Sequence, residues 1–152
     1  MAIQVGGTTV VDNSRNLTNI VSAVSSNTVS LTRISESIVE LGNTHTNPNI
    51  NLFAGTVFRA TLNANATFTL TGGNVQAATG VSSNVTSFTL ILTNDNVANR
   101  TVAWAGGTFR FPGGSSALAR TTGAGNTDVW FFFTPDRGTT WFGSQPMKDL
   151  LA

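Results

Sequence analysis

The sequence DVWFFFTPDRGTTWFG, residues 128–143, is the clearest structural signal in this chain. Two apolar, aromatic-rich runs lie on either side of the turn sequence Pro135–Gly138. Aromatic and β-branched residues around a turn of Pro, Asp and Gly predict a β-hairpin. The four consecutive aromatic residues at 130–133 predict a strand that is buried on both faces, or one whose second face meets a partner subunit.

The aromatic residues of this hairpin and one tryptophan upstream are interpreted together as core or intersubunit packing. Aromatic rings also have apolar faces and polar edges, so a sugar-stacking platform of the three tryptophans with Phe142 is the alternative interpretation. The full set is Trp104, Trp130, Phe131, Phe132, Phe133, Trp141 and Phe142.

Outward from the hairpin, strand and turn signals alternate through residues 36–145. Short strands with turn signals every 8–12 residues or so predict a sandwich or barrel. We therefore expect an all-β domain over 36–145, an antiparallel, jelly-roll-like β-sandwich. The expected strands are 50–53, 56–62, 66–70, 87–93, 101–104, 109–111, 118–122, 128–133 and 139–143.

Residues 1–35 are polar and weakly patterned, which predicts an extended N-terminal arm. Apolar residues at spacings of three, four and seven in Asn16–Val24 predict a short helix within it. The arm buries too little to fold alone, so we expect it to anchor the protein on another chain or assist oligomerisation. The predicted anchoring residues are Gly6, Gly7, Arg15, Asn16, Leu17 and Ile20.

Two boundaries are less clear from the pattern. Leu31, Ile34, Ile38 and Leu41 have heptad spacing, but two heptads are too few to indicate a coiled coil. We expect a short helix or an extended linker there, followed by a strand from about residue 36. A C-terminal tail is expected over 146–152.

The composition excludes several classes of function. Charged residues make up 10% of the chain and the net charge is +1, whereas nucleic-acid binding needs clustered Lys and Arg. Cysteine is absent, which excludes disulfides and thiolate catalysis. No signal peptide or membrane-spanning run is recognisable, so we expect synthesis in a cytoplasm and no membrane insertion. A neutral polar surface is cheap to desolvate and favours protein–protein contacts.

Candidates for catalysis or metal binding are few. His45, the single histidine, lies in a polar loop and is interpreted as solvated. Asp128 and Asp136 would lie at opposite ends of one hairpin arm, so turn capping explains them better than a glycosidase pair. Asn94-Asp95-Asn96 offers oxygen ligands, but the EF-hand pattern is missing and a turn is favoured. We expect no catalytic residue, metal site or cofactor.

Two segments resemble virion proteins of tailed bacteriophages, especially marine phages and cyanophages. The first is VGGTTVVDNSRNLTNI, residues 5–20, which is similar to a segment recurring in tail-fibre and related proteins. The second resembles a domain of the same proteins, with SFTLILT at 87–93, TVAW at 101–104, FPGG at 111–114 and the hairpin at 128–143. The resemblance implies a β-structured virion module, commonly trimeric.

The expected function is therefore that of a non-enzymatic phage structural protein. We expect a homo-oligomeric fibre or appendage subunit, such as a tail fibre, head fibre or capsid decoration, whose arm docks on other virion proteins. The alternative is an adhesin module that binds host-surface glycan. The expected location is the virion.

Overall fold

The computed structural model describes residues 3–5, 8–11, 35–44, 47–72, 85–95, 100–114 and 123–150. The chain divides into two compact units, Met1–Ile34 and Ser35–Ala152. In the first unit, β1 (Ile3–Val5) and β2 (Thr8–Val11) pair antiparallel. The helix predicted over 16–24 and all six anchoring residues lie outside the described residues.

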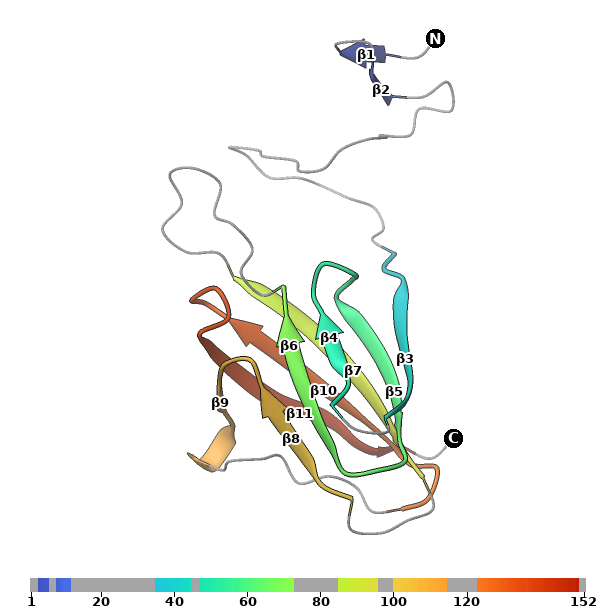
Figure 1. The fold of residues 1–152 in the computed structure, drawn as a ribbon, viewed down its shortest axis with the longest axis vertical. Helices are drawn as coiled ribbons and strands as arrows, with labels where there is room; N and C mark the ends of the chain where they lie inside the picture. The colour runs from blue at the N-terminus through green and yellow to red at the C-terminus, as the bar shows by residue number, and fades with distance from the viewer. Residues whose placement is uncertain are drawn as a thin grey trace. The chain divides into compact units, whose positions relative to one another are not determined.

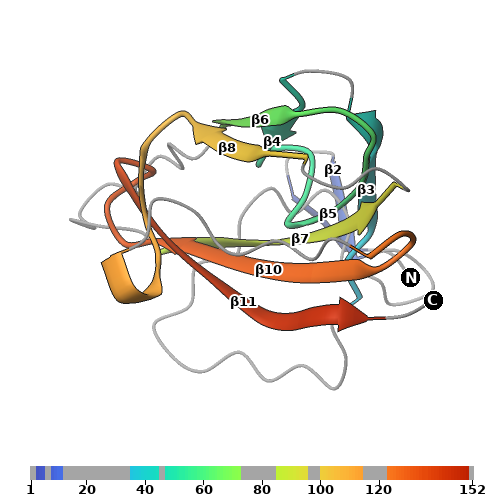
Figure 2. The ribbon, with the colours of Figure 1, turned by 90° about the horizontal axis from the view of Figure 1, so that it is seen from below.

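The second unit is a sandwich of two sheets, which confirms the predicted all-β, sandwich-like fold (Figures 1 and 2). The larger sheet has six strands in the order β3 (Ile38–Thr44), β5 (Val57–Leu62), β7 (Thr86–Asn94), β10 (Thr127–Thr134), β11 (Thr140–Leu150) and β9 (Thr108–Arg110). The smaller sheet has three, in the order β4 (Asn49–Asn51), β6 (Ala66–Thr71) and β8 (Val102–Ala105). A 3₁₀ turn, η1 (Pro112–Gly114), follows β9.

Side chains alternate between the inside and the outside of the sandwich, as strand geometry requires. In β7 the buried positions are 88, 90, 92 and 94, and in β10 they are 128, 130, 132 and 134. The core fills the space between the two sheets with aromatic and aliphatic side chains. Its centre is the Phe132 ring, whose centroid lies 4.8 Å from that of Phe88 and 4.5 Å from that of Trp104.

Strand directions in the sandwich are mixed, so the expectation of purely antiparallel sheets was wrong in this respect. β10 runs antiparallel to both β7 and β11, whereas β3, β5 and β7 run parallel to one another. The reason is the path of the chain: β3, β5 and β7 belong to the larger sheet, and β4, β6 and β8 to the smaller. Each connection from β3 to β8 therefore carries the chain across to the other sheet. The next strand that returns to the same sheet runs parallel to the previous strand of that sheet.

Two sequence expectations at the domain boundaries can be compared with the described strands. β3 begins at Ile38, so the segment after residue 36 forms a strand. β11 continues through Pro146 to Leu150, where a tail was expected. The weak strand expected over 118–122 lies outside the described residues.

Candidate interaction surface

The outer face of the larger sheet carries three exposed phenylalanines, named here the aromatic patch: Phe131, Phe133 and Phe142. Their exposed fractions are 39%, 38% and 39%. Phe133 lies directly opposite Phe142 on the neighbouring strand, and their rings stack at 5.3 Å between centroids. Phe131 lies next along β10, with its ring centroid 6.4 Å from that of Phe133. An outward-facing sheet surface in a monomer is normally polar, so this patch is a candidate contact surface.

The apolar surface extends along β11 beyond the patch. Two register shifts between β10 and β11 place Met147 opposite Val129 and Leu150 opposite Thr127. Side chains directly opposite each other on paired strands emerge on the same face, and both Met147 and Leu150 are exposed. The outer face of this half of the sheet is therefore apolar over much of the length of β11.

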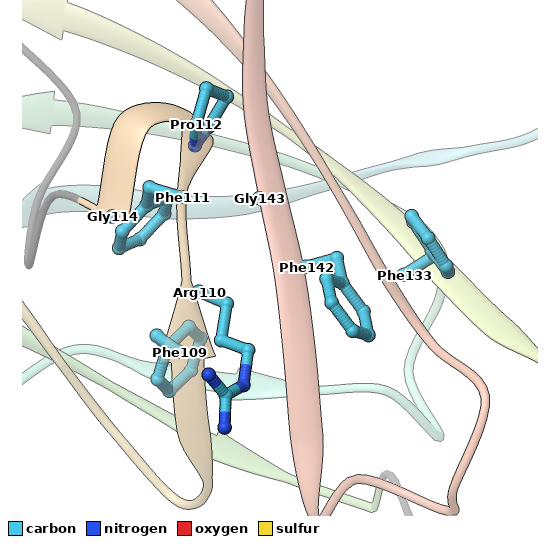
Figure 3. Close-up of a pocket in the computed structure, with 8 residues that line it drawn as sticks. All are labelled: Phe109, Arg110, Phe111, Pro112, Gly114, Phe133, Phe142 and Gly143. Atoms are coloured by element: carbon cyan, nitrogen blue, oxygen red, sulfur yellow. The ribbon is translucent and has the colours of Figure 1, made fainter.

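A pocket of about 500 Å³ adjoins the aromatic patch where the edge strand β9 leaves the sheet (Figure 3). Its walls come from β9 and the turn after it, from β11 and from β10. Residue 143 in its wall has no room for a side chain, because a Cβ at Gly143 would lie 2.5 Å from Cε1 of Phe111 and 2.6 Å from Cε1 of Phe132. The lining residues are Phe109, Arg110, Phe111, Pro112, Gly114, Phe133, Phe142 and Gly143.

Arg110 is the charged residue of this pocket. Within the described residues it forms no ion pair with a carboxylate. By contrast, Arg59 and Glu40 pair on the same sheet at 2.5 Å between Nη2 and Oε1, and this pair lowers the pKa of Glu40 and raises that of Arg59. Arg100 pairs with Asp95 at 3.0 Å. The pocket thus combines aromatic walls with a cation that forms no ion pair within the described residues.

The β10–β11 turn holds the patch-bearing strands in register. The Asp136 carboxylate accepts hydrogen bonds from the Thr140 backbone N–H and the Thr134 hydroxyl, both at 2.8 Å. The Gly138 N–H donates to the same Thr134 hydroxyl at 2.9 Å. These bonds favour the ionised carboxylate, above all the bond from the Thr140 N–H, and they hold the pKa of Asp136 below its ordinary value of 3.8.

Because the pKa of Asp136 is lower in the folded chain than in the unfolded chain, its contribution to stability is present above pH 3.8 and is lost as the pH falls through the folded-state pKa. We expect Asp136→Asn to be less stable than the native chain at neutral pH, with the difference shrinking below pH 3.8. Urea unfolding of both proteins at neutral and acidic pH measures this. A difference that stays constant with pH would contradict the assignment.

The seven aromatic residues singled out from the sequence form two groups. Four belong to or pack against the core between the sheets, and three lie on the outer face of the larger sheet. Trp130, Phe132 and Trp141 are buried in the core, and Trp104 is half-buried and packs against it. The other three form the aromatic patch. The three tryptophans therefore share no exposed surface in this chain, and the sugar-stacking platform built from them is wrong.

The remaining candidates from the sequence do not form a reactive centre in the described part of the chain. Asp128 is buried at the far end of β10 from Asp136 and accepts a hydrogen bond from the Asp149 N–H at 3.1 Å. Asn94 is buried and Asp95 pairs with Arg100. His45 and Asn96 lie outside the described residues.

The described residues contain no cluster of three or more His, Cys, Asp or Glu side chains that could hold a metal ion. Over the same ranges, no helix has the length and apolar character that a membrane span needs.

The sequence did not predict the pocket or the position of Arg110 in its wall. Arg110 and Phe142 lie far apart in the sequence, and they meet because β9 pairs in parallel with β11, with Arg110 directly opposite Phe142. The alternation of Phe109, Arg110 and Phe111 around the expected strand was the available signal, since it places the charge on the opposite face from the two rings.

Comparison of the chain with protein-family models, curated proteins and solved structures gives no match. The geometry of the sheet face and its pocket is therefore the basis for a functional assignment.

Proposed function

We propose that this chain is a non-enzymatic structural subunit of a tailed-phage particle, a fibre, appendage or decoration subunit that acts as a homo-oligomer, with a trimer favoured. The observation that carries the proposal is the aromatic patch on the outer face of the larger sheet. Three phenylalanines of one exposed surface contact one another there instead of entering the core. Clustered apolar surface of this kind marks protein–protein contacts.

The composition supports association through that surface. Charged residues are 10% of the chain, so the neighbouring surface of Thr, Ser and Asn is cheap to desolvate when subunits meet. The outward positions of β7 beside the patch are Ser87, Thr89, Ile91 and Thr93, and none carries a charge. A standing interface can therefore extend from the aromatic patch across the middle of the sheet.

The assignment to a phage particle is supported by the resemblance of the segments at 5–20 and 87–143 to tail-fibre and related virion proteins. The arm supplies a means of docking on capsid or tail proteins. Its unit, Met1–Ile34, is separate from the sandwich unit. One chain would thus combine an attachment segment with an oligomeric β-module.

Deleting residues 1–27 is expected to abolish attachment to the particle, because the deletion removes the whole anchoring set, which ends at Ile20. All strands of the sandwich unit are retained, so the remaining chain should keep a β-type circular dichroism spectrum. Co-sedimentation of the tagged protein with purified particles measures attachment. A truncated protein that still co-sediments would refute the docking role of the arm.

A further inference from the structure

We propose that the occupant of the aromatic patch and its pocket is the β3 side of the next copy of this chain, with Arg110 of one copy facing Glu36 of the other. This inference rests on the proposed homo-oligomer and specifies which surfaces meet in it. The two surfaces lie at opposite sides of the same sheet. That sheet begins at β3 and ends at β9 (Figure 1).

The strand register places the two surfaces at the same level along the strands. Arg110 lies opposite Phe142, and Phe142 lies opposite Phe133. One row along, Phe131 lies opposite Thr89, Thr89 opposite Val57, and Val57 opposite Ile38. Glu36 precedes Ile38 by two residues, just before β3 begins, on the side of this row that faces the row of Arg110.

Arg110 and Glu36 carry opposite charges, and neither is paired with another ion of the described sheet. Glu40 is satisfied by Arg59. Glu36 accepts a hydrogen bond from the Thr56 hydroxyl and has no cation among the described residues. Arg110 likewise lacks an anion there. Each surface therefore presents at its margin an exposed charge that has no ion pair among the described residues, and the two charges are of opposite sign.

Apolar complementarity accompanies the charges. Ile38 is 44% exposed and lies between Glu36 and Glu40 on the outer face. A pocket of about 500 Å³ walled by phenylalanines is large enough to admit an isoleucine side chain. Seating Ile38 against Phe133 and Phe142 would remove apolar surface of both copies from water, which stabilises the contact.

The arrangement has a defined symmetry. The two complementary surfaces are different parts of one sheet, so the contact is heterologous. Repeating a heterologous contact gives a ring when the rotation between neighbours closes, and the closed ring is the assembly proposed here. The β9 side of each copy then meets the β3 side of the next, which covers the aromatic patch. A two-fold dimer, in which a surface meets itself, is not the expected assembly.

Charge exchange in the full-length chain tests this contact. Arg110→Glu and Glu36→Arg each place like charges together, and each is expected to raise the dissociation constant of the oligomer at least about tenfold. The double variant Arg110→Glu/Glu36→Arg restores opposite charges at every interface and is expected to assemble nearly as well as the native chain. Lys148→Glu, at an exposed lysine near the end of β11, is the control with the same change in net charge.

Sedimentation equilibrium over a range of concentrations gives all five dissociation constants, including that of the native chain. Rescue in the double variant, with little effect of Lys148→Glu, would support the contact. Native oligomers that are unaffected by either reversal, or a double variant weakened by the sum of both, would overturn it and leave the pocket to another occupant such as a glycan. The homo-oligomer would still stand in those cases. A native chain that stays monomeric throughout would overturn the proposed function itself.

Discussion

Replacing Phe132 by alanine is expected to lower the free energy of unfolding by about 3–5 kcal/mol. The Phe132 side chain is 0% exposed and lies between the two sheets. Its ring contacts Phe88 and Trp104 at centroid distances of 4.8 and 4.5 Å, and it packs edge-on against Phe109 and Phe111. Truncation would leave a cavity that these rigid rings cannot fill. The variant therefore loses the transfer free energy of the removed atoms and bears the further cost of the cavity.

Phe131→Ala is the matched control, because it removes the same atoms from the adjacent residue on the opposite face of β10. It is expected to change the stability of the isolated chain by well under half as much, because the side chain is already partly in water. Chemical denaturation measures both variants at concentrations low enough to keep the chain monomeric, since association adds to apparent stability. Equal losses for the two substitutions would contradict the assignment of inward and outward faces.

The triple substitution of Phe131, Phe133 and Phe142 by serine is expected to dissociate the oligomer while leaving the sandwich folded. Truncating a hot-spot residue at the centre of an interface costs about 2 kcal/mol or more of binding. Three together should therefore raise the dissociation constant at least about a hundredfold. The core packing of Phe132 and Trp141 is untouched, so the β-type circular dichroism spectrum should persist.

Phe53→Ser is the control for surface phenylalanines in general. Phe53 is 76% exposed in the turn after β4 and belongs to neither the patch nor its pocket. It should leave association unchanged when measured by sedimentation equilibrium alongside the triple variant. If Phe53→Ser weakened association as much as the triple variant, the aromatic patch would lose its special role.

The sequence predicted the strands of the sandwich far better than their directions. Alternation in segments such as Thr86–Asn94 and the turn at Pro135–Gly138 is local information, and both strands form. A turn signal only shows that the chain changes direction. It does not show whether the chain returns within one sheet, as from β10 to β11, or crosses to the other, as it does between β3 and β8. The parallel pairings follow from that second choice.

The candidate surface was predictable in part. The aromatic run at 130–133 left open whether its second face was core or interface, and the exposures of Phe131 and Phe133 show that this face is open in the single chain. The pocket was beyond local reasoning, because its walls come from β9, β10 and β11. Its cation, Arg110, meets Phe142 only through a parallel pairing between distant segments.

Assembly of this chain with itself through the aromatic patch is tested most directly by its mass in solution. Light scattering gives that mass for the native protein and for the Phe131/Phe133/Phe142→Ser variant over a range of concentrations. We expect three times the mass of the 152-residue chain for the native protein and the mass of one chain for the variant. A native protein with the mass of one chain at every concentration, or a variant that keeps the full oligomeric mass, would contradict this assembly.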